Sequence, residues 1–417
     1  MKRLAVYLNE ARVGVLTDGD EPVFAYDAGW LADGAAYPLS RRLPLQSEPF
    51  SGRVVQVFFA GLLPEAEPRD RIASILGISA GNDFALLERI GGECAGAVSL
   101  LPEETPPPSS GGGRLRWLDE TELATILEAL PRQPLMAGED GVRLSLAGAQ
   151  LKLPVVLATA HPAAEPRVAL PLDGTPSTHI IKPEPTRFPG LVANEVWCLA
   201  LARRLGLEAA EARSRTIGQT PCLIVKRYDR QSAAGEPVRR LHQEDFCQAM
   251  GFPPARKYQQ EGGPSLRDCF ALIRDWSSAP VLDIVRLLDA VIFAALTGNA
   301  DAHAKNHSFL YAGGTRRMAP LYDQVCTLAW PELSTSLSMK IGSAGTLAEV
   351  SPEHFKQLSA EARLGWPMVR ERLANLCAKM IESIRRDEIP TAPETAGSGP
   401  ANLILPRAER MLRLMKE

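Results

Sequence analysis

The stretch Asn299-Ala300-Asp301-Ala302-His303-Ala304-Lys305-Asn306 follows a strongly apolar helical pattern over residues 283–297. It places Asp301 five positions before Asn306. A catalytic loop for phosphoryl transfer uses this arrangement, because the aspartate accepts the proton of a substrate hydroxyl and the asparagine holds a magnesium ion on the nucleotide phosphates. Further along, Asp323 could supply a second metal-holding carboxylate. The spacing by itself is weak evidence, and a polar loop that caps two elements is an equally good interpretation.

Composition places the chain among ordinary globular proteins. Its 417 residues are 45% hydrophobic and 23% charged, which leaves room for two or three domains. The net charge is −3, and no run of basic residues predicts an independent nucleic-acid surface, although DNA contact through a partner stays open. The seven cysteines are widely spaced and form no Cys-x-x-Cys pair, which argues against a zinc site and favours reduced thiols.

The start of the chain does not have the pattern of a targeting segment. Its apolar run breaks at Asn9 and Glu10, too early for a signal peptide, and no apolar stretch approaches the length of a membrane span. We therefore expect a cytoplasmic protein with no membrane partner.

Three parts are expected along the chain: residues 1–105, 115–230 and 231–417. A segment rich in Pro, Ser and Gly at 103–114 separates the first two. Hydrophobic periodicity predicts strands at 3–8, 13–16, 152–158, 179–182 and 222–225, and helices at 69–76, 83–90, 120–130, 194–205, 283–297 and 401–417. The last helix follows a loop at 390–400, and the third part reads as mostly helical. The order strand, helix, strand in the second part suits the small lobe of a two-lobed kinase, as it suits many α+β domains.

Two charged residues in the second part could serve a nucleotide site. Lys182 ends an apolar strand, where its ammonium could meet a phosphate, although a solvated lysine at a strand edge is the more common case. Glu195 lies at the start of a predicted helix and could pair with Lys182, as kinase lysines are paired. The alternative is a carboxylate favoured by the helix dipole, and both interpretations can hold at once.

Small residues follow Ser145 in the sequence Ser145-Leu146-Ala147-Gly148-Ala149-Gln150-Leu151-Lys152. They would let backbone N–H groups approach a phosphate, but a tight turn is the more common use of such a segment. The exit of the strand at 222–225 is a possible hinge between lobes, where the backbone could bond adenine beside Tyr228. His303 has no acidic partners in a zinc pattern, so a structural or phosphate-contacting role is expected for it.

Taken together, these segments resemble the HipA family of serine/threonine kinases, the toxin halves of bacterial toxin–antitoxin pairs. The resemblance covers nearly the whole chain, and its motifs appear in the family's order: Phe58–Glu65, Ile90–Val98, Ser145–Lys152, Thr178–Lys182, Asn194-Glu195, Gln243–Gln248, Lys257-Tyr258, Gly262–Pro264, Asp301–Asn306 and Leu321–Asp323. One departure is Leu151, which stands where the family usually has an acidic residue.

The resemblance implies an α+β, two-lobed protein-kinase-like fold with a small N-terminal α/β module and a mostly helical C-terminal lobe. It implies that Asp301 is the catalytic base and that Asn306 and Asp323 hold Mg²⁺. It implies Glu195 as the ion-pair partner of Lys182, and an ATP site formed by Ala147, Gly148, Ala149, Gln150, Leu151, Lys152, Lys182, Lys226, Arg227, Tyr228, His303, Ala304, Lys305, Asn306, Tyr322 and Asp323. In the family, autophosphorylation at the position of Ser145 expels the phosphate loop and switches the kinase off.

The resemblance also implies partners. The family's best-known substrate is an aminoacyl-tRNA synthetase, whose phosphorylation stalls translation and induces dormancy or persistence. The family partner is a separate helix-turn-helix antitoxin of HipB type, which neutralises the kinase and carries the DNA contact. Two alternatives remain at the level of sequence: a phosphotransferase that acts on a small molecule, and a non-catalytic co-repressor that assembles with the antitoxin on DNA.

Overall fold

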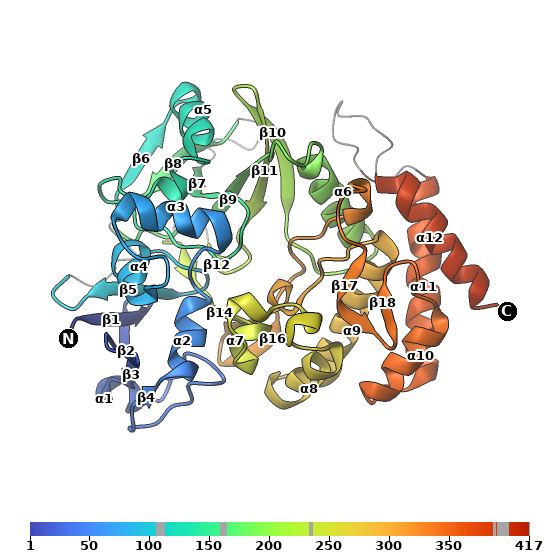
Figure 1. Cartoon of the computed structure of the whole chain (residues 1–417), viewed down its shortest axis with the longest axis horizontal. Coiled ribbons are helices and arrows are strands. Elements are labelled where there is room, and N and C mark those ends of the chain that lie inside the picture. Colours follow the sequence, from blue (N-terminus) through green and yellow to red (C-terminus); the bar gives the residue numbers. More distant parts are fainter. Residues whose placement is uncertain (106–112, 159–164, 233–236, 387–388, 390–399, 417) are drawn as a thin grey trace.

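Two lobes and an N-terminal module make up the chain in the computed structural model, which describes residues 1–105, 113–158, 165–232, 237–386, 389 and 400–416 (Figure 1). Most of the predicted linker at 103–114, and the loop at 390–400 up to Pro400, lie outside the described residues. We use "N-terminal module" for residues 1–105, "small lobe" for 115–230 and "large lobe" for 231–417. Among the described helices, none combines the length and hydropathy needed to cross a bilayer.

The N-terminal module is an antiparallel sheet covered by short helices. Its strands run in the order β4-β3-β2-β1-β5, with bounds Phe50–Ser51, Val23–Tyr26, Ala11–Thr17, Arg3–Leu8 and Val98–Pro102. Its helices are α1 (Ala28–Leu31), α2 (Arg53–Ala60), α3 (Ala66–Leu76) and α4 (Asp83–Ile90). The apolar run after residue 53, which ends before Pro64, becomes α2. Asn82 caps the start of helix α4, because its side chain accepts a hydrogen bond from the N–H of Ala85 and so satisfies a donor of the first turn.

A single antiparallel sheet forms the body of the small lobe. Its order is β10-β11-β9-β7-β8-β6, with bounds Ala212–Ile217, Thr220–Lys226, His179–Pro183, Leu153–Ala158, Arg167–Pro171 and Leu115–Leu118. Helix α5 (Glu120–Ala129) begins with a reciprocal capping box between Asp119 and Glu122. Helix α6 (Leu191–Arg204) connects β9 to β10 and contacts both the small-lobe sheet and helices of the large lobe. Glu184 accepts hydrogen bonds from N–H groups at the start of α6.

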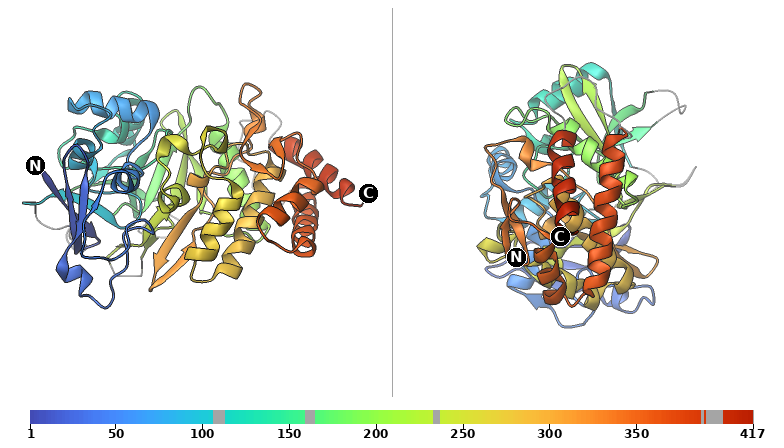
Figure 2. Two further views of the ribbon diagram at one scale, coloured as in Figure 1. Left: turned by 60° about the horizontal axis from the view of Figure 1, so that its bottom comes forward. Right: turned by 90° about the vertical axis from the view of Figure 1, so that its right-hand side faces the viewer.

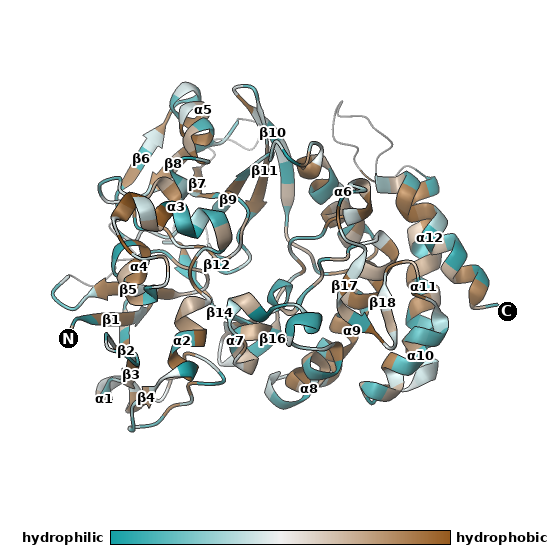
Figure 3. Ribbon diagram, viewed as in Figure 1, coloured by the Kyte–Doolittle hydropathy of each residue, from teal (hydrophilic) through white to brown (hydrophobic). Residues whose placement is uncertain are grey.

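The large lobe is built mainly from helices α7 (Phe246–Met250), α8 (Leu266–Trp276), α9 (Pro280–Thr297), α10 (Pro352–Glu361), α11 (Trp366–Arg385) and α12 (Pro400–Leu414). Helix α9 starts with Pro280, whose fixed φ suits a first turn, and ends at Gly298, whose φ of +73° is left-handed. Helices α11 and α12 lie side by side at the end of the molecule (Figure 2). On α12, Ile404, Ala408 and Met411 are buried, and apolar and polar positions alternate along it (Figure 3).

Short strands interrupt the helices of the large lobe. One sheet has the order β14-β15-β16, and two further strand pairs are β12-β13 and β17-β18. Their bounds are His242–Asp245, Ser308–Ala312, Thr315–Met318, Arg230–Gln231, Arg239–Arg240, Ser336–Ile341 and Ala344–Thr346. The predicted α+β class and two-lobed fold are confirmed. The strands β3, β4, β5, β6, β8 and β10, and those of the large lobe, were not predicted, because their formation depends on partners that are remote in sequence.

Two large hydrophobic cores organise the chain. One lies in the large lobe around α9, where Leu287, Leu288 and Phe293 are fully buried. The other joins the N-terminal module to the small lobe, since Leu4 and Phe58 share one cluster with Leu153, Ile181 and Ile224. The module therefore packs against the back of the small-lobe sheet and contributes to one wall of the space between the lobes.

Candidate active site

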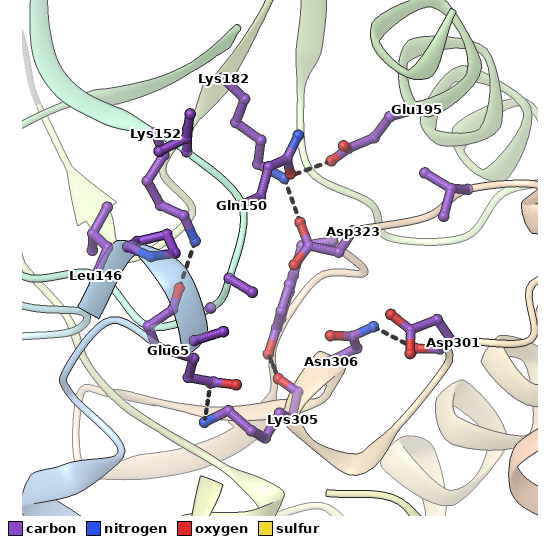
Figure 4. Close-up of a pocket in the computed structure, with 18 of the residues that line it drawn as sticks. Glu65, Leu146, Gln150, Lys152, Lys182, Glu195, Asp301, Lys305, Asn306 and Asp323 are labelled. Carbon is purple, nitrogen blue, oxygen red and sulfur yellow. Dashed lines mark hydrogen bonds and ion pairs between the residues drawn. The ribbon is translucent and has the colours of Figure 1, made fainter. Parts of the chain in front are cut away.

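A cleft of about 1220 Å³ lies where the small lobe, the large lobe and the N-terminal module meet. This volume is ample for a nucleotide, since ligand pockets commonly measure about 300–1,000 Å³. Strand β9, helix α6, the loop after α9 and the loop after β16 all contribute to its walls. Figure 4 shows the side chains that point into it.

Lys182 is the centre of an ion triad in this cleft. Its ammonium lies 2.9 Å from Glu195 Oε1 and 2.5 Å from Asp323 Oδ1. The three residues come from β9, from α6 and from the loop after β16 (Figure 4). The side chains of Lys182 and Glu195 are buried, whereas that of Asp323 is 48% exposed and faces the cleft. The predicted pairing of Lys182 with Glu195 is thus present in the structure.

The charges of the triad shift one another's pKa values. Burial alone would lower the pKa of Lys182, but Asp323 and Glu195 outweigh it and raise the pKa above its ordinary value. Partial desolvation in the cleft opposes ionisation of the half-exposed Asp323 as well, yet Lys182 and Lys152 hold its pKa below the usual range. Lys182 therefore keeps its positive charge, and Asp323 its negative charge, at neutral pH. Asp323 also has a φ of +51°, a left-handed conformation that costs a non-glycine residue about 1 kcal/mol and is often found at functional sites.

The segment after Ser145 crosses the cleft as a tight loop. Gly148 has a φ of +105°, which L-residues rarely adopt, and its carbonyl accepts a hydrogen bond from the N–H of Glu65 at 3.1 Å. The ammonium of Lys152 turns back to the carbonyl of Ala147 at 2.5 Å. Burial lowers the pKa of Lys152 to about 8, partly offset by Asp323. The N-terminal module thus holds the loop in place through its backbone.

Ser145 itself is fully buried in this arrangement. Its hydroxyl donates to the carbonyl of Leu62, at 2.8 Å, and its N–H donates to the carbonyl of Glu93, at 2.9 Å. Both acceptors belong to the N-terminal module. The serine at the predicted modification site is therefore not accessible while the loop stays in the cleft.

The loop after α9 brings Asp301 and Asn306 to the opposite side of the cleft. Asn306 is 7% exposed, lies in a 3₁₀ turn (Ala304–Asn306), and donates through Nδ2 to the carbonyl of Asp301 at 3.0 Å. Asn299 accepts a hydrogen bond from the N–H of Asp301, also at 3.0 Å. The surrounding walls displace water and raise the pKa of Asp301, although a hydrogen bond from Tyr258 opposes the change. A carboxylate with a raised pKa suits proton acceptance.

A second group of charged residues flanks the loop after α9. The ammonium of Lys305, which is buried, lies 2.7 Å from Asp245 Oδ2 and 3.6 Å from Glu65 Oε1. Glu65 also pairs with Lys257 at 2.9 Å. Burial opposes the charge of Lys305, but Asp245 and Glu65 outweigh it and raise the pKa. Lys305 was predicted as a nucleotide contact, and its ammonium is committed to two carboxylates here.

The residues of the predicted hinge, 226–228, differ in whether their side chains are available to a ligand in the cleft. Tyr228 stacks on Tyr322 with ring centroids 5.5 Å apart, and both rings line the cleft. Arg227 also borders the cleft, but its guanidinium is buried in ion pairs with Glu93 and Asp229. Lys226 is exposed and pairs with Glu211 at 3.3 Å. Any adenine contact of Lys226 and Arg227 would therefore come from their backbone.

His303 is a neutral imidazole in this site. Burial, then the nearby Lys257 and Lys305, lower its pKa to about 3. Its Nδ1 has no hydrogen-bond partner among the described residues, and its ring packs edge-on against Tyr258 at 5.5 Å. A neutral ring with an unsatisfied buried nitrogen agrees with a contact to a ligand.

Most of the predicted residues line a single cleft: Ala147–Lys152, Lys182, Glu195, Lys226, Arg227, Tyr228, Asp301, His303, Lys305, Asn306, Tyr322 and Asp323. Ala304, which was also predicted, is fully buried in the 3₁₀ turn and does not line the cleft. Several charged or polar residues that line the cleft were not predicted as part of the site, among them Glu65, Asp245, Lys257 and Tyr258. All four lie inside segments that carry the family resemblance, so those segments held the only available signal. Their approach to Asp301 and Lys305 depends on tertiary packing.

Comparisons with known proteins identify related sequences over most of the chain. The family model for the HipA N-terminal domain matches residues 4–101, and the model for the HipA-like C-terminal domain matches residues 144–387. A protein of Sinorhizobium fredii with the name "Putative kinase Y4mE" is 47% identical over 366 residues, which cover 87% of this chain and 86% of that protein. The serine/threonine-protein kinase toxin HipA of Shewanella oneidensis is 33% identical over 353 residues, covering 81% of this chain and 78% of the toxin.

A solved structure extends the likeness to the whole fold. It is the complex of Shewanella oneidensis HipA with HipB and its operator DNA, and its match has a TM-score of 0.86 at 27% identity. The superposition covers 99% of this chain and 98% of that one. Two family models, two relatives that cover more than three quarters of the chain and a match over the whole fold agree with one another. This chain belongs to the HipA family.

Proposed function

We propose that this chain is an ATP-dependent serine/threonine protein kinase of the toxin type. The observation that carries the proposal is the meeting of Lys182, Glu195 and Asp323 with Asp301 and Asn306 around one cleft. A lysine–glutamate pair, a metal-holding carboxylate and an Asp-x-x-x-x-Asn loop are the parts that protein kinases use. The names of the relatives support the same activity.

The residues around the upper cleft fit a nucleotide. Among the described residues, the ammonium of Lys152 donates a hydrogen bond only to the carbonyl of Ala147. An anion bound next to it would accept hydrogen bonds from its remaining N–H groups. Gly148 has no side chain, so the backbone of the loop could approach a bound phosphate closely at this position. Lys182, on strand β9, would bind phosphate oxygens of the nucleotide. Tyr228 and Tyr322 would face its adenine base.

The residues also fit a magnesium ion. Among the described residues, no group of three or more His, Cys, Asp or Glu side chains is placed to hold a metal. Magnesium does not require such a group in a kinase, because one or two protein oxygens suffice when phosphates and waters complete the octahedron. Asp323, whose side chain faces the cleft, and Asn306 would supply these oxygens. Bound there, the ion would neutralise charge on the phosphates.

Asp301 would serve as the general base. Its carboxylate faces the cleft, and its backbone is held by Asn299 and Asn306. An acceptor hydroxyl that approaches it would lose its proton to the carboxylate as the oxygen attacks the γ-phosphorus, with ADP as leaving group. Lys182 and Lys152 would stabilise the charge that develops on the phosphate oxygens.

We further propose that Ser145 is autophosphorylated and that this switches the kinase off. A phosphoserine carries about −1.5 to −2 charges at neutral pH, and the serine is fully buried against the carbonyl oxygens of Leu62 and Glu93. A charged phosphate would not be accommodated at a fully buried hydroxyl that faces these two carbonyl oxygens, so modification would keep the loop out of the cleft. Nucleotide binding would be lost with it.

The partners are proposed by analogy with the family. The Shewanella relative was solved with HipB and operator DNA, and we propose that this chain binds a separate helix-turn-helix antitoxin that carries the DNA contact. An aminoacyl-tRNA synthetase in the cytoplasm is the proposed substrate class, and its phosphorylation would arrest growth.

Transfer of radiolabel from ATP tests the activity. The full-length protein, incubated with Mg-ATP and a cell extract, should label protein bands, and Asp301→Ala should label none. Label that appears in a small metabolite would favour the small-molecule alternative. An absence of both ATP turnover and labelling would favour the non-catalytic co-repressor.

A further inference from the structure

The hydroxyl of Tyr258 lies 2.9 Å from Asp301 Oδ1 and donates a hydrogen bond to it. The two residues are 43 positions apart in sequence. Tyr258 comes from the segment 254–264, which runs between α7 and α8 along the rim of the cleft. Tyr258 therefore approaches the Asp301 carboxylate from a different segment than the loop that carries Asp301.

The segment around Tyr258 is held on several sides. Lys257 pairs with Glu65 of the N-terminal module at 2.9 Å, and Gln259 accepts a hydrogen bond from the N–H of Lys340 at 2.7 Å. Gly263 returns so closely that an added Cβ would lie 2.8 Å from the carbonyl oxygen of Tyr258. The N-terminal module and the large lobe thus hold the tyrosine in one place. The phenol hydroxyl of Tyr258 is therefore held in position to donate its hydrogen bond.

The carboxylate of Asp301 depends on this donor for its orientation. Hydrogen bonds from Asn306 and to Asn299 hold only the backbone of Asp301. The terminal torsion of an aspartate is broad, so the carboxylate turns easily unless one oxygen is bound. Tyr258 binds Oδ1, and Oδ2 has no hydrogen-bond partner among the residues that the structure describes.

We propose, resting on the kinase function proposed above, that Tyr258 is a positioning residue that holds Oδ1 of Asp301 and so presents Oδ2 to the acceptor hydroxyl. The tyrosine does not exchange a proton with the substrate. It removes the need to orient the base during each turnover, which is the advantage of a preorganised site. Its ring also packs against His303 at 5.5 Å, and this contact does not depend on the hydroxyl.

Tyr258→Phe tests the proposal because it removes the hydroxyl and keeps the ring. Phosphate transfer from labelled ATP to myelin basic protein, and to the chain itself, is measured with the full-length protein. We expect kcat to fall roughly tenfold, the size expected for loss of one hydrogen bond to a charged group. The KM for ATP and the affinity for a non-hydrolysable ATP analogue should stay within about twofold of wild type, since Tyr258 acts on the base. Tyr37→Phe, which removes a hydroxyl outside the cleft, is the matched control and should behave as wild type.

A double-mutant cycle shows whether the tyrosine acts through Asp301. In an Asp301→Asn background, Tyr258→Phe should cause no further loss of the residual rate. An additional tenfold loss there would overturn the proposal, as would a kcat for Tyr258→Phe equal to wild type. An increased rate would overturn it in another way, because it would make the hydroxyl an occupant of the acceptor position. If the wild-type protein labels no protein, the kinase function fails, whereas labelling by wild type with an unaffected Tyr258→Phe rejects only the role of the tyrosine.

Discussion

Lys182 and Asp323 are 141 positions apart in sequence, and their charged atoms lie 2.5 Å apart in the structure. One belongs to a strand of the small lobe and the other to a loop of the large lobe, so this contact joins the two lobes across the cleft. Glu195 holds the other side of the same ammonium at 2.9 Å. The relative position of the two lobes therefore depends on the charges of Lys182 and Asp323.

Replacing Lys182 by Ala should weaken nucleotide binding and transfer, because a buried cation aimed at the phosphates is lost. Two carboxylates, Glu195 and Asp323, would also be left facing each other without their counter-charge. Arg at this position should not fully restore activity, since a planar fork fits a point-charge site poorly. Calorimetric titration with a non-hydrolysable ATP analogue measures the effect, with the exposed Lys2→Ala as control. Wild-type affinity and rate in Lys182→Ala would contradict the assignment.

Single substitutions Asp301→Ala, Asn306→Ala and Asp323→Ala should each reduce phosphoryl transfer by about a hundredfold or more. Asp301 supplies proton acceptance, and the other two supply oxygens for the metal. Steady-state rates with Mg-ATP give the comparison, and circular dichroism checks that each variant is folded. Asp20→Ala, an exposed aspartate of the N-terminal module, should keep wild-type activity. A folded Asp301→Ala protein with normal turnover would refute the role of the base.

Replacing Gly148 by Ala should disturb the loop without unfolding the chain. The backbone φ of +105° is unfavourable for alanine, and the new Cβ would lie 2.8 Å from Nζ of Lys152. We expect ATP affinity to fall, while the thermal midpoint changes by only a few degrees because the loop lies outside both cores. Gly34→Ala, where nothing lies near the added carbon, is the control. An unaltered ATP affinity would show that the loop does not contact the nucleotide.

Phosphorylation of Ser145 should release the loop at 145–152 from the cleft. Incubation with Mg-ATP followed by phosphopeptide mapping identifies the site, and hydrogen exchange of the loop should then increase. Ser145→Ala should remain active for longer, because it cannot be modified and loses only one hydrogen bond to Leu62, a loss of about 1 kcal/mol. A phosphorylated form that binds ATP as tightly as the unmodified protein would argue against the switch.

Glu244 predicts a pH dependence of stability. It is fully buried, and its carboxylate accepts hydrogen bonds from Ser40, from the N–H of Arg41 and from Tyr311. Burial raises its pKa from 4.5 to about 7, despite these donors. The folded protein therefore keeps a proton that the unfolded chain has released, and the stabilisation is fully present below about pH 4.5 and lost as pH rises through about 7.

Urea unfolding at pH 5.0 and pH 8.0 measures this effect in wild type and in Glu244→Gln. The amide cannot ionise, so Gln should lower the dependence of the unfolding free energy on pH, and its relative stability should be greatest at pH 8.0. Glu353→Gln, on the surface of α10, is the matched control. An identical pH dependence in wild type and Glu244→Gln would assign the titration to other groups.

Local sequence was sufficient for the long, regular elements. The apolar periodicity of α9, the helical pattern of α4 and the apolar strand that ends at Lys182 each depend on a few neighbouring residues, so their signals are visible in sequence. The Asp-x-x-x-x-Asn spacing likewise places Asp301 and Asn306 in one loop. Short strands such as β8 and β10 were missed, because their formation depends on partners that are remote in sequence.

What sequence by itself determined is the set of chemical groups and their local geometry: a lysine that ends a strand, a small-residue loop, and an aspartate with an asparagine in one turn. Only the tertiary structure decided how these groups meet. It placed Glu65 of the N-terminal module beside Lys257 and Lys305, brought Tyr258 to Asp301, and turned the guanidinium of Arg227 away into a buried cluster. The physical reason is that ion pairs and hydrogen bonds act over a few ångströms of space, and the shared hydrophobic cores bring distant segments within that range.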